Sequence, residues 1–73
     1  MDWAKVVGEN VRRLRKERGL TQEQLAMETG IDLTYLGGIE RGRRNPSIKV
    51  LGNLAGVLEV LPATLLTPTA SRS

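Results

Sequence analysis

Apolar side chains recur every three or four residues along most of this chain, which is the spacing of an amphipathic helix with one buried side. Helix-capping residues and glycines interrupt the pattern at short intervals, so each helix must be short. The residues that begin or end the first three segments are Asp2, Gly19, Thr21, Gly30, Asp32 and Gly42. No segment alternates with the two-residue period of a strand, and the pattern therefore predicts an all-α fold.

We expect a compact bundle of five short helices. The expected ranges are 2–18, 21–29, 33–41, a fourth helix from 48 to at least 58, and 62–66. The side chains expected to line the core are Trp3, Val6 or Val7, Val11, Leu14, Leu25, Ala26, Leu36, Ile39, Ile48, Leu51, Leu54, Ala55 and Leu58. Residues 67–73 lack a large apolar side chain, so we expect a flexible C-terminal tail after a single domain of residues 1–66.

The 73 residues include no cysteine and no histidine. This composition excludes a disulfide framework and a Cys/His zinc site, and we expect no metal, no cofactor and no small-molecule ligand. No apolar run approaches the roughly 18 residues that span a bilayer, and the first residues lack the basic-then-apolar layout of a signal peptide. We therefore expect a soluble, cytoplasmic protein with no membrane partner.

The 11 lysines and arginines exceed the 8 aspartates and glutamates only enough to give a net charge of +3. The cations are nevertheless clustered in two parts of the chain. They are Arg12, Arg13, Arg15, Lys16 and Arg18 in the first expected helix, and Arg41, Arg43, Arg44 and Lys49 after the third. Clustered cations favour an anionic partner such as nucleic acid, although a solvated helix face produces the same run of charge.

A short turn that contains Gly30 joins the second and third expected helices. Such a turn sets two helices at a large angle and leaves the second one protruding, in a form that fits the major groove of DNA. The chain resembles, over about residues 8–66, the repressor-type helix-turn-helix family of phage and bacterial regulators. The residues at the spacings of that family are Gln22, Ala26, Gly30, Leu36, Ile39 and Glu40. The stretch from Asp32 to Asn45 also resembles the controller proteins of restriction-modification systems.

The resemblance implies a small transcription regulator that binds double-stranded DNA and is associated with the nucleoid. It implies that a recognition helix of about residues 33–41 lies in the major groove, and that two copies bind a two-fold-related operator. The alternative is a protein-interaction module of the same fold, such as an antitoxin-like or anti-regulator partner. We do not expect an enzyme, because the sequence has no His or Cys and no glycine-rich phosphate loop.

The starts of the second and third helices are the expected points of DNA contact. Thr21 is expected to cap the second helix, and Gln22 either contacts a phosphate or is simply a residue suited to a helix start. The resemblance places Leu33 and Thr34 where the family reads bases. Because Leu33 has no hydrogen-bonding group, we expect it to touch a thymine methyl group and to add little discrimination.

Three residues of the third helix have two interpretations each. Gly37 and Gly38 each cost about 1 kcal/mol relative to alanine inside a helix, so the absence of their side chains needs a reason. Close approach to DNA is one reason and close packing on a neighbouring helix is the other; their place on the polar side of the helix favours DNA. Tyr35 either places its hydroxyl on a phosphate or belongs to the core.

The segment after the third helix is expected to bind the DNA backbone. Guanidinium groups suit phosphates and the narrow minor groove, and amide and ammonium groups add further backbone contacts. The residues of this segment are Arg41, Arg43, Arg44, Asn45 and Lys49. The resemblance further implies a structural ion pair between Arg15 and Glu40, which we expect to orient the recognition helix.

The fourth and fifth helices carry more apolar residues than one core needs. Val50 and Val57 lie on an arc beside the core stripe, and Leu61 and Leu65 follow. We expect these four residues to form the contact of a two-fold homodimer that reads half-sites about one helical turn apart. The alternative is that they widen the core of one subunit.

Overall fold

The computed structural model describes residues 1–69, and all the regular secondary structure in that range is helical. The helices are α1 (Trp3–Glu17), α2 (Gln22–Thr29), α3 (Leu33–Glu40), α4 (Ile48–Leu58) and α5 (Pro62–Leu65). The all-α prediction is confirmed, and the expected ends lie within a residue of the observed ones. Within the described range, no helix has the length and apolar character that crossing a membrane requires.

Side-chain caps begin the first four helices. The capping oxygens come from Asp2, Thr21, Asp32 and Ser47, and each accepts from a backbone N–H two or three residues further on. At α2 the cap is reciprocal: the Gln24 N–H donates to Thr21 Oγ1 at 3.0 Å, and the Thr21 N–H donates to Gln24 Oε1 at 2.8 Å. Gly30 and Gly42 follow α2 and α3 with φ of 76° and 74°, a left-handed geometry that lets the chain leave each helix sharply.

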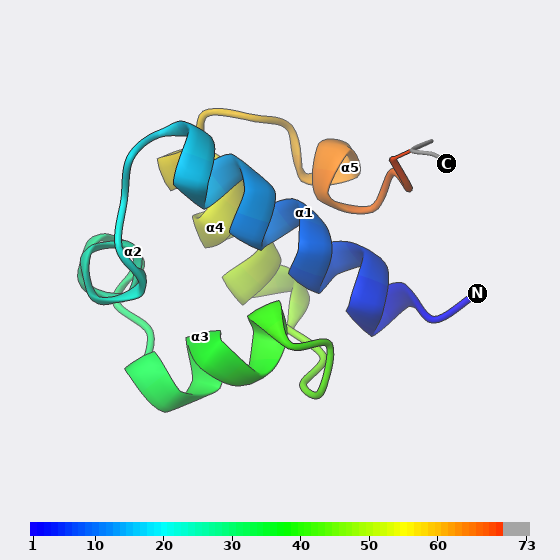
Figure 1. Ribbon diagram of the computed structural model, residues 1–73, viewed down its shortest axis with the longest axis horizontal. Coiled ribbons are helices and arrows are strands. Elements are labelled where there is room, and N and C mark those ends of the chain that lie inside the picture. Colours follow the sequence, from blue (N-terminus) through cyan, green and yellow to red (C-terminus); the bar gives the residue numbers. More distant parts are fainter. Residues whose placement is uncertain (70–73) are drawn as a thin grey trace.

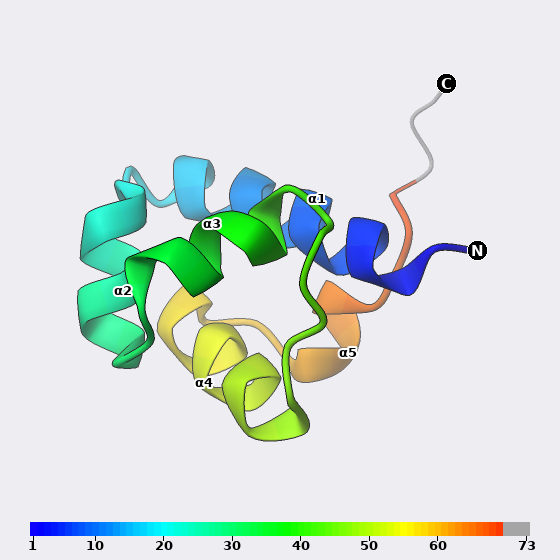
Figure 2. The same ribbon diagram turned by 90° about the horizontal axis from the view of Figure 1, so that it is seen from below.

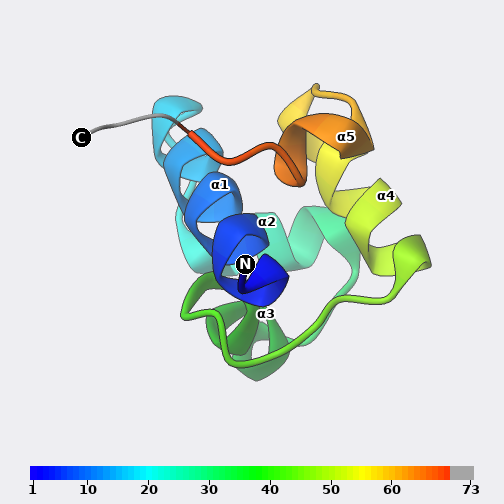
Figure 3. The ribbon, with the colours of Figure 1, turned by 90° about the vertical axis from the view of Figure 1, so that its right-hand side faces the viewer.

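Helix α1 contacts α3, α4 and α5, while α2 packs on α3 and α4, and α4 packs on α5 (Figure 1). Figure 3 shows α3 on one side of the domain and α5 on the opposite side. From the α3 side, α3 crosses in front of α1, and the loop that follows it runs across the front of the domain to α4 (Figure 2). The second helix of the helix-turn-helix therefore lies at the surface.

One cluster of buried apolar side chains holds the bundle together. Its members are Val7, Val11, Leu25, Ala26, Leu36, Ile39, Leu54, Ala55, Leu58 and Leu65. Of the other expected members, Leu14 and Leu51 are only partly buried and pack against this cluster, whereas Trp3 is 51% exposed and Ile48 is 88% exposed. Trp3 and Ile48 are each the first residue of a helix, and helical side chains tilt toward the N-terminus, so these two project past the end of the bundle.

Asn10 fastens α5 to α1. Its side chain is 1% exposed, and Nδ2 donates to the carbonyl oxygens of Leu65 and Thr67, both at 2.9 Å. Helix C-termini leave carbonyls without intrahelical partners, and Asn10 supplies the donor that the end of α5 needs. Thr67 also donates from Oγ1 to the Ala63 carbonyl at 2.7 Å. Thr67, the first residue of the expected tail, is therefore bonded to both α1 and α5; the flexibility of the tail stays a prediction, and its residues 70–73 lie outside the described residues.

Candidate nucleic-acid interface

The turn between α2 and α3 sets the direction of α3. The N–H groups of Gly30 and Ile31 both donate to the carbonyl of Ala26, at 2.9 and 3.1 Å, and this closes the end of α2. Ile31 packs against the core from this corner. Asp32 then begins α3 by accepting from the N–H groups of its first turn. The chain thus changes direction within three residues, and the first turn of α3 stays at the surface.

The exposed side chains of that first turn are Leu33 and Thr34, the two residues expected to read bases. Leu33 is 42% exposed, although large apolar side chains are usually buried. The Thr34 N–H donates to the Asp32 carboxylate at 2.9 Å, whereas its hydroxyl has no hydrogen-bond partner within residues 1–69. The start of α3 therefore offers one apolar contact and one free hydroxyl.

The ion pair expected between Arg15 and Glu40 is present and has two bonds. Arg15 Nε donates to Glu40 Oε2 at 2.7 Å, and Nη2 donates to Oε1 at 3.0 Å. The two side chains are only 10% and 2% exposed. Arg15 Nη1 also donates to the Leu20 carbonyl at 2.8 Å. Because these bonds join α1, the loop before α2 and the end of α3, they fix the orientation of α3.

Gln22 belongs to the same network. Its Nε2 donates to Glu40 Oε1 at 3.0 Å, and its side chain is half-buried. Neither interpretation from the sequence included this contact. It leaves one amide N–H of Gln22 available for a phosphate at the N-terminus of α2, where the helix dipole favours an anion. Thr21 beside it is exposed and is occupied by its capping bonds with Gln24.

Gly37 and Gly38 are buried, which corrects the expectation that they form an open surface for DNA. Arginine side chains cover both. A Cβ placed on Gly37 would lie 3.1 Å from Arg41 Nη1, and one placed on Gly38 would lie 2.5 Å from Arg44 Cγ. The polar side of α3 is open in a helical wheel, but long side chains from the next residues fold back across it. The glycines thus make room for arginine.

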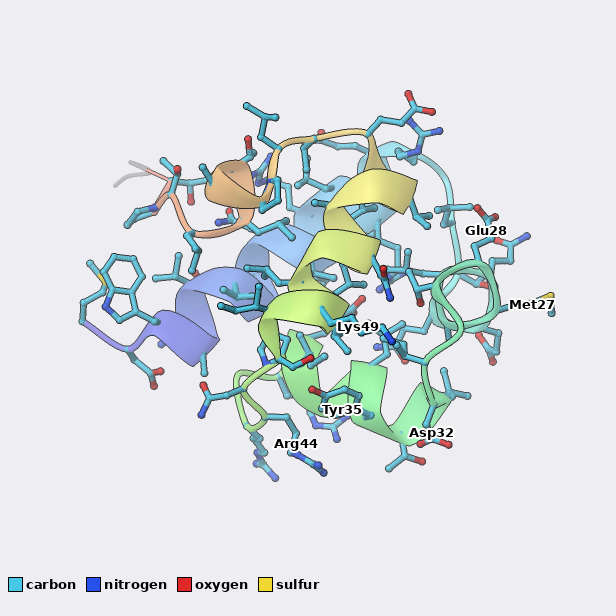
Figure 4. All side chains as sticks on the ribbon, turned by 180° about the vertical axis from the view of Figure 1, so that it is seen from behind. Met27, Glu28, Asp32, Tyr35, Arg44 and Lys49 are labelled. Atoms are coloured by element: carbon cyan, nitrogen blue, oxygen red, sulfur yellow. The ribbon has the colours of Figure 1, made fainter. Side chains whose placement is uncertain are left out.

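The sequence indicates that Tyr35 either places its hydroxyl on a phosphate or belongs to the core; in the structure its ring and its hydroxyl have different surroundings. Its ring is half-buried and packs against the core, and its hydroxyl donates to the Asn45 carbonyl at 3.4 Å. The Arg44 guanidinium lies 5.1 Å from the centre of the ring, a cation–π distance. Figure 4 shows Tyr35 and Arg44 together on one face, with Lys49 on the adjoining turn of α4.

The cations expected to bind the DNA backbone are exposed. They are Arg41, Arg43, Arg44 and Lys49, with Asn45 exposed among them. The ion pairs within residues 1–69 join Arg13 to Glu17, Arg15 to Glu40, and Arg18 to Glu59. None of these pairs includes the four cations after α3. Their positive charge is therefore not neutralised by a neighbouring carboxylate, and it attracts anions to the α3 side of the domain.

The four residues expected at a dimer contact do not share one environment. Leu61 is 72% exposed, and Val50 and Val57 are half-buried at the edge of the core. Leu65 is 0% exposed, so the expectation that it contacts a second subunit is wrong for this structure. The reason is that α5 is short and docks on α1 and α4, which turns Leu65 inward.

Two buried residues are not singled out by the sequence pattern. A Cβ on Gly8 would meet the backbone oxygens of Ile39 and Glu40, so this glycine lets α1 approach α3 closely. The cost of glycine inside a helix, which drew attention to Gly37, applies equally to Gly8 and is the signal that identifies it. Asn10 stands in the apolar stripe of α1, where a polar residue needs a buried partner.

The short turn, the surface helix that follows it and the unpaired cations define a helix-turn-helix domain. Residues 11–65 match the helix-turn-helix family, and the chain belongs to this family. It is 49% identical over 69 residues to y4dJ, an uncharacterized helix-turn-helix-type transcriptional regulator of Sinorhizobium fredii; the match spans 94% of this chain and 90% of y4dJ. The resemblance to repressor-type regulators is confirmed.

Solved structures agree with this assignment. The restriction-modification controller protein C.AhdI from Aeromonas hydrophila is 42% identical with a TM-score of 0.81, over 85% of this chain and 94% of that chain. SinR, a transcriptional regulator of Bacillus, has been solved in complex with DNA; it is 39% identical with a TM-score of 0.80, over 84% of this chain and 98% of that chain. The similarity to controller proteins is therefore confirmed as well.

Proposed function

We propose that this protein is a transcription regulator that binds double-stranded DNA, with the first turn of α3 in the major groove and the following loop on the phosphates. The observation that carries the proposal is the group of unpaired, exposed cations that follows α3, the helix whose first turn exposes Leu33 and Thr34. Phosphate contacts provide affinity and orientation, and base contacts provide sequence preference. We also propose that it acts in the cytoplasm, where bacterial DNA lies.

The buried network around Glu40 supports the proposal. A recognition helix must be held in one orientation if its side chains are to meet base edges in register. The Arg15–Glu40 bonds tie the end of α3 to α1, and the Gln22–Glu40 bond ties the start of α2 to the end of α3. Transcriptional regulators among the relatives, and a neighbour solved with DNA, support the same function.

The side chains at the start of α3 suggest a particular kind of base reading. Leu33 suits the methyl group of thymine, and the free Thr34 hydroxyl suits either a donor or an acceptor on a base edge. Neither forms the bidentate bonds that discriminate best. We therefore infer that the DNA backbone supplies most of the affinity and that sequence preference is modest.

Selection from a random duplex library tests this function. Bound fragments are enriched over several rounds, and their affinity is then compared with that of a scrambled duplex by fluorescence anisotropy. We expect an enriched site that includes thymine opposite Leu33 and binds about 10³-fold more tightly than the scrambled duplex, at the low end of the range for specific binding. Binding to no duplex, or equal binding to both, contradicts the proposal.

We further propose that the regulator acts as a homodimer. Leu61 is a large apolar side chain left 72% exposed on the link between α4 and α5, and Val57 lies on the adjoining turn of α4. A two-fold contact there would cover Leu61 and leave α3, on the opposite side of the domain from α5, free for DNA (Figure 3).

A further inference from the structure

We infer that Gly38 and Tyr35 are positioning residues for Arg44, and that they hold its guanidinium beside α3 before DNA arrives. This inference rests on the proposed DNA-binding function and identifies one cation of the interface as preorganised. Gly38 provides the space for the aliphatic stem of Arg44, and Tyr35 provides the surface for its charged end. We call these three residues the arginine seat.

Gly38 is buried, and the atoms that cover it belong to Arg44. A Cβ on Gly38 would lie 2.5 Å from Arg44 Cγ, 3.5 Å from its Cβ and 3.6 Å from its Cδ. These atoms are the stem of the side chain, which cannot swing away as easily as its tip. An alanine at position 38 would therefore displace Arg44 as a whole.

The backbone after α3 brings Arg44 to this place. Gly42 has a φ of 74° and its N–H donates to the Ile39 carbonyl at 3.0 Å, while the Arg43 N–H donates to the Gly38 carbonyl at 2.9 Å. These two bonds fold the loop back over the last turn of α3. The residue that follows, Arg44, then has the stem of its side chain over Gly38, while the residue as a whole stays exposed.

Tyr35 lies on the same face of α3, one turn before Gly38. The ring is fixed by its packing on the core and by the hydroxyl bond to Asn45, so it forms a firm surface for the Arg44 guanidinium 5.1 Å from its centre. No carboxylate within residues 1–69 pairs with Arg44. The guanidinium is thus placed by a neutral ring and keeps its whole charge for a phosphate.

Preorganisation has a direct consequence for binding. A long side chain loses rotamer freedom when it is immobilised at an interface, and one that is already held loses less. Gly37 differs in this respect, because a Cβ there would meet only the tip of Arg41, at 3.1 Å from Nη1. The seat accordingly depends on Gly38 and not on small residues in α3 generally.

A double-mutant cycle of Gly38→Ala and Arg44→Ala tests the seat. Gly52→Ala is the matched control, because Gly52 is exposed inside α4 with open space around it. Each variant is studied by thermal unfolding without DNA and by anisotropy with a labelled duplex selected by the wild-type protein. Thermal unfolding tests whether Gly38 provides the space for Arg44, and anisotropy tests whether that placement of Arg44 changes the affinity for DNA.

In thermal unfolding, Gly52→Ala should raise Tm by about 4 °C both in the wild-type protein and in the Arg44→Ala variant, because alanine is the better helix former. Gly38→Ala should raise Tm by a similar amount only when Arg44 is alanine, since the Arg44 Cβ alone leaves ordinary contact at 3.5 Å. If Gly38→Ala raises Tm by the full amount while Arg44 is present, the added methyl group does not displace Arg44. That result would overturn the arginine seat.

In binding, Gly38→Ala should weaken affinity about threefold to tenfold with Arg44 present, and less than twofold in the Arg44→Ala background. It should also flatten the dependence of log affinity on log salt toward that of Arg44→Ala, which loses about one phosphate contact. Tyr35→Leu should weaken affinity only when Arg44 is present.

Other results overturn the inference in distinct ways. Equal losses for Gly38→Ala in both backgrounds would mean that the glycine itself faces DNA. If the effects of Gly38→Ala and Arg44→Ala are coupled in Tm but not in DNA affinity, the arginine seat contributes to stability only. Gly38 would then not position Arg44 for DNA. If the wild-type protein binds no duplex, the proposed function fails and the positioning role fails with it, whereas the unfolding cycle still decides whether the seat exists.

Discussion

Glu40 at the end of α3 and Arg15 in α1 form a two-bond ion pair, with Nε–Oε2 at 2.7 Å and Nη2–Oε1 at 3.0 Å. The Glu40 side chain is 2% exposed and also accepts from Gln22 at the start of α2. One carboxylate therefore joins three helices, and it lies at the end of the helix that we propose reads DNA. This arrangement connects the stability of the domain to the orientation of its interface.

Glu40→Ala should lower the free energy of unfolding by about 3 kcal/mol, because it leaves the buried Arg15 guanidinium without its counter-charge. Urea unfolding followed by circular dichroism measures the change. Glu17→Ala, which breaks the exposed pair with Arg13, is the control and should change stability by about 0.5 kcal/mol or less. Equal effects of the two substitutions would show that the buried pair has no special role.

Asn10→Ala should destabilise the domain by about 2 kcal/mol, since it leaves the carbonyls at the end of α5 without their buried donor. Asn10→Asp should be at least as harmful, because a carboxylate would face the same carbonyl oxygens. Thermal unfolding of both variants provides the comparison. If Asn10→Asp is as stable as the wild-type protein, Asn10 does not act as a donor to α5.

Gly8→Ala should destabilise the domain by about 1–3 kcal/mol, because the added methyl group meets backbone oxygens of α3 that cannot move aside. Gly52→Ala makes the same chemical change in open space and should stabilise by up to about 1 kcal/mol. The sign of the two changes in urea unfolding is the test. A stabilising Gly8→Ala would mean that α1 and α3 are not in close contact.

Leu61→Asp should convert the proposed homodimer to monomers, because it places a charge at the centre of the contact. Sedimentation equilibrium at micromolar concentration should give about twice the chain mass of 8.0 kDa for the wild-type protein and 8.0 kDa for the variant. Ile48→Asp is the control, since Ile48 is 88% exposed on another part of the surface. A wild-type mass of 8.0 kDa, or dissociation by Ile48→Asp alone, contradicts the proposed contact.

The helices could be predicted from the sequence because their signals are local. Each cap lies within three residues of the N–H that it accepts from, and the apolar spacing within one helix already identifies most of the core. Periodicity gives no position along the bundle axis, however. Trp3 and Ile48 have the right spacing and still lie outside the core, because each stands at the first position of its helix.

The parts of the site that the sequence left open depend on contacts between distant residues. Leu65 is buried in a helix whose final carbonyl is bound by Asn10, 55 residues away along the chain. Gln22 bonds to Glu40 across 18 residues. The burial of Gly38 depends on where the loop places Arg44, which no helical wheel of α3 includes. The exposure of Thr34 and Lys49, by contrast, could be predicted without knowing any contact between distant residues.

Salt dependence of DNA binding tests the central claim most directly. Anisotropy titrations of a labelled duplex carrying the selected site, at several concentrations of KCl, give the slope of log affinity against log salt. If Arg41, Arg43, Arg44 and Lys49 each neutralise a phosphate, the slope should be about −3.5 per subunit. A slope near zero, or no association even in dilute buffer, would contradict the claim that this face of the domain binds DNA.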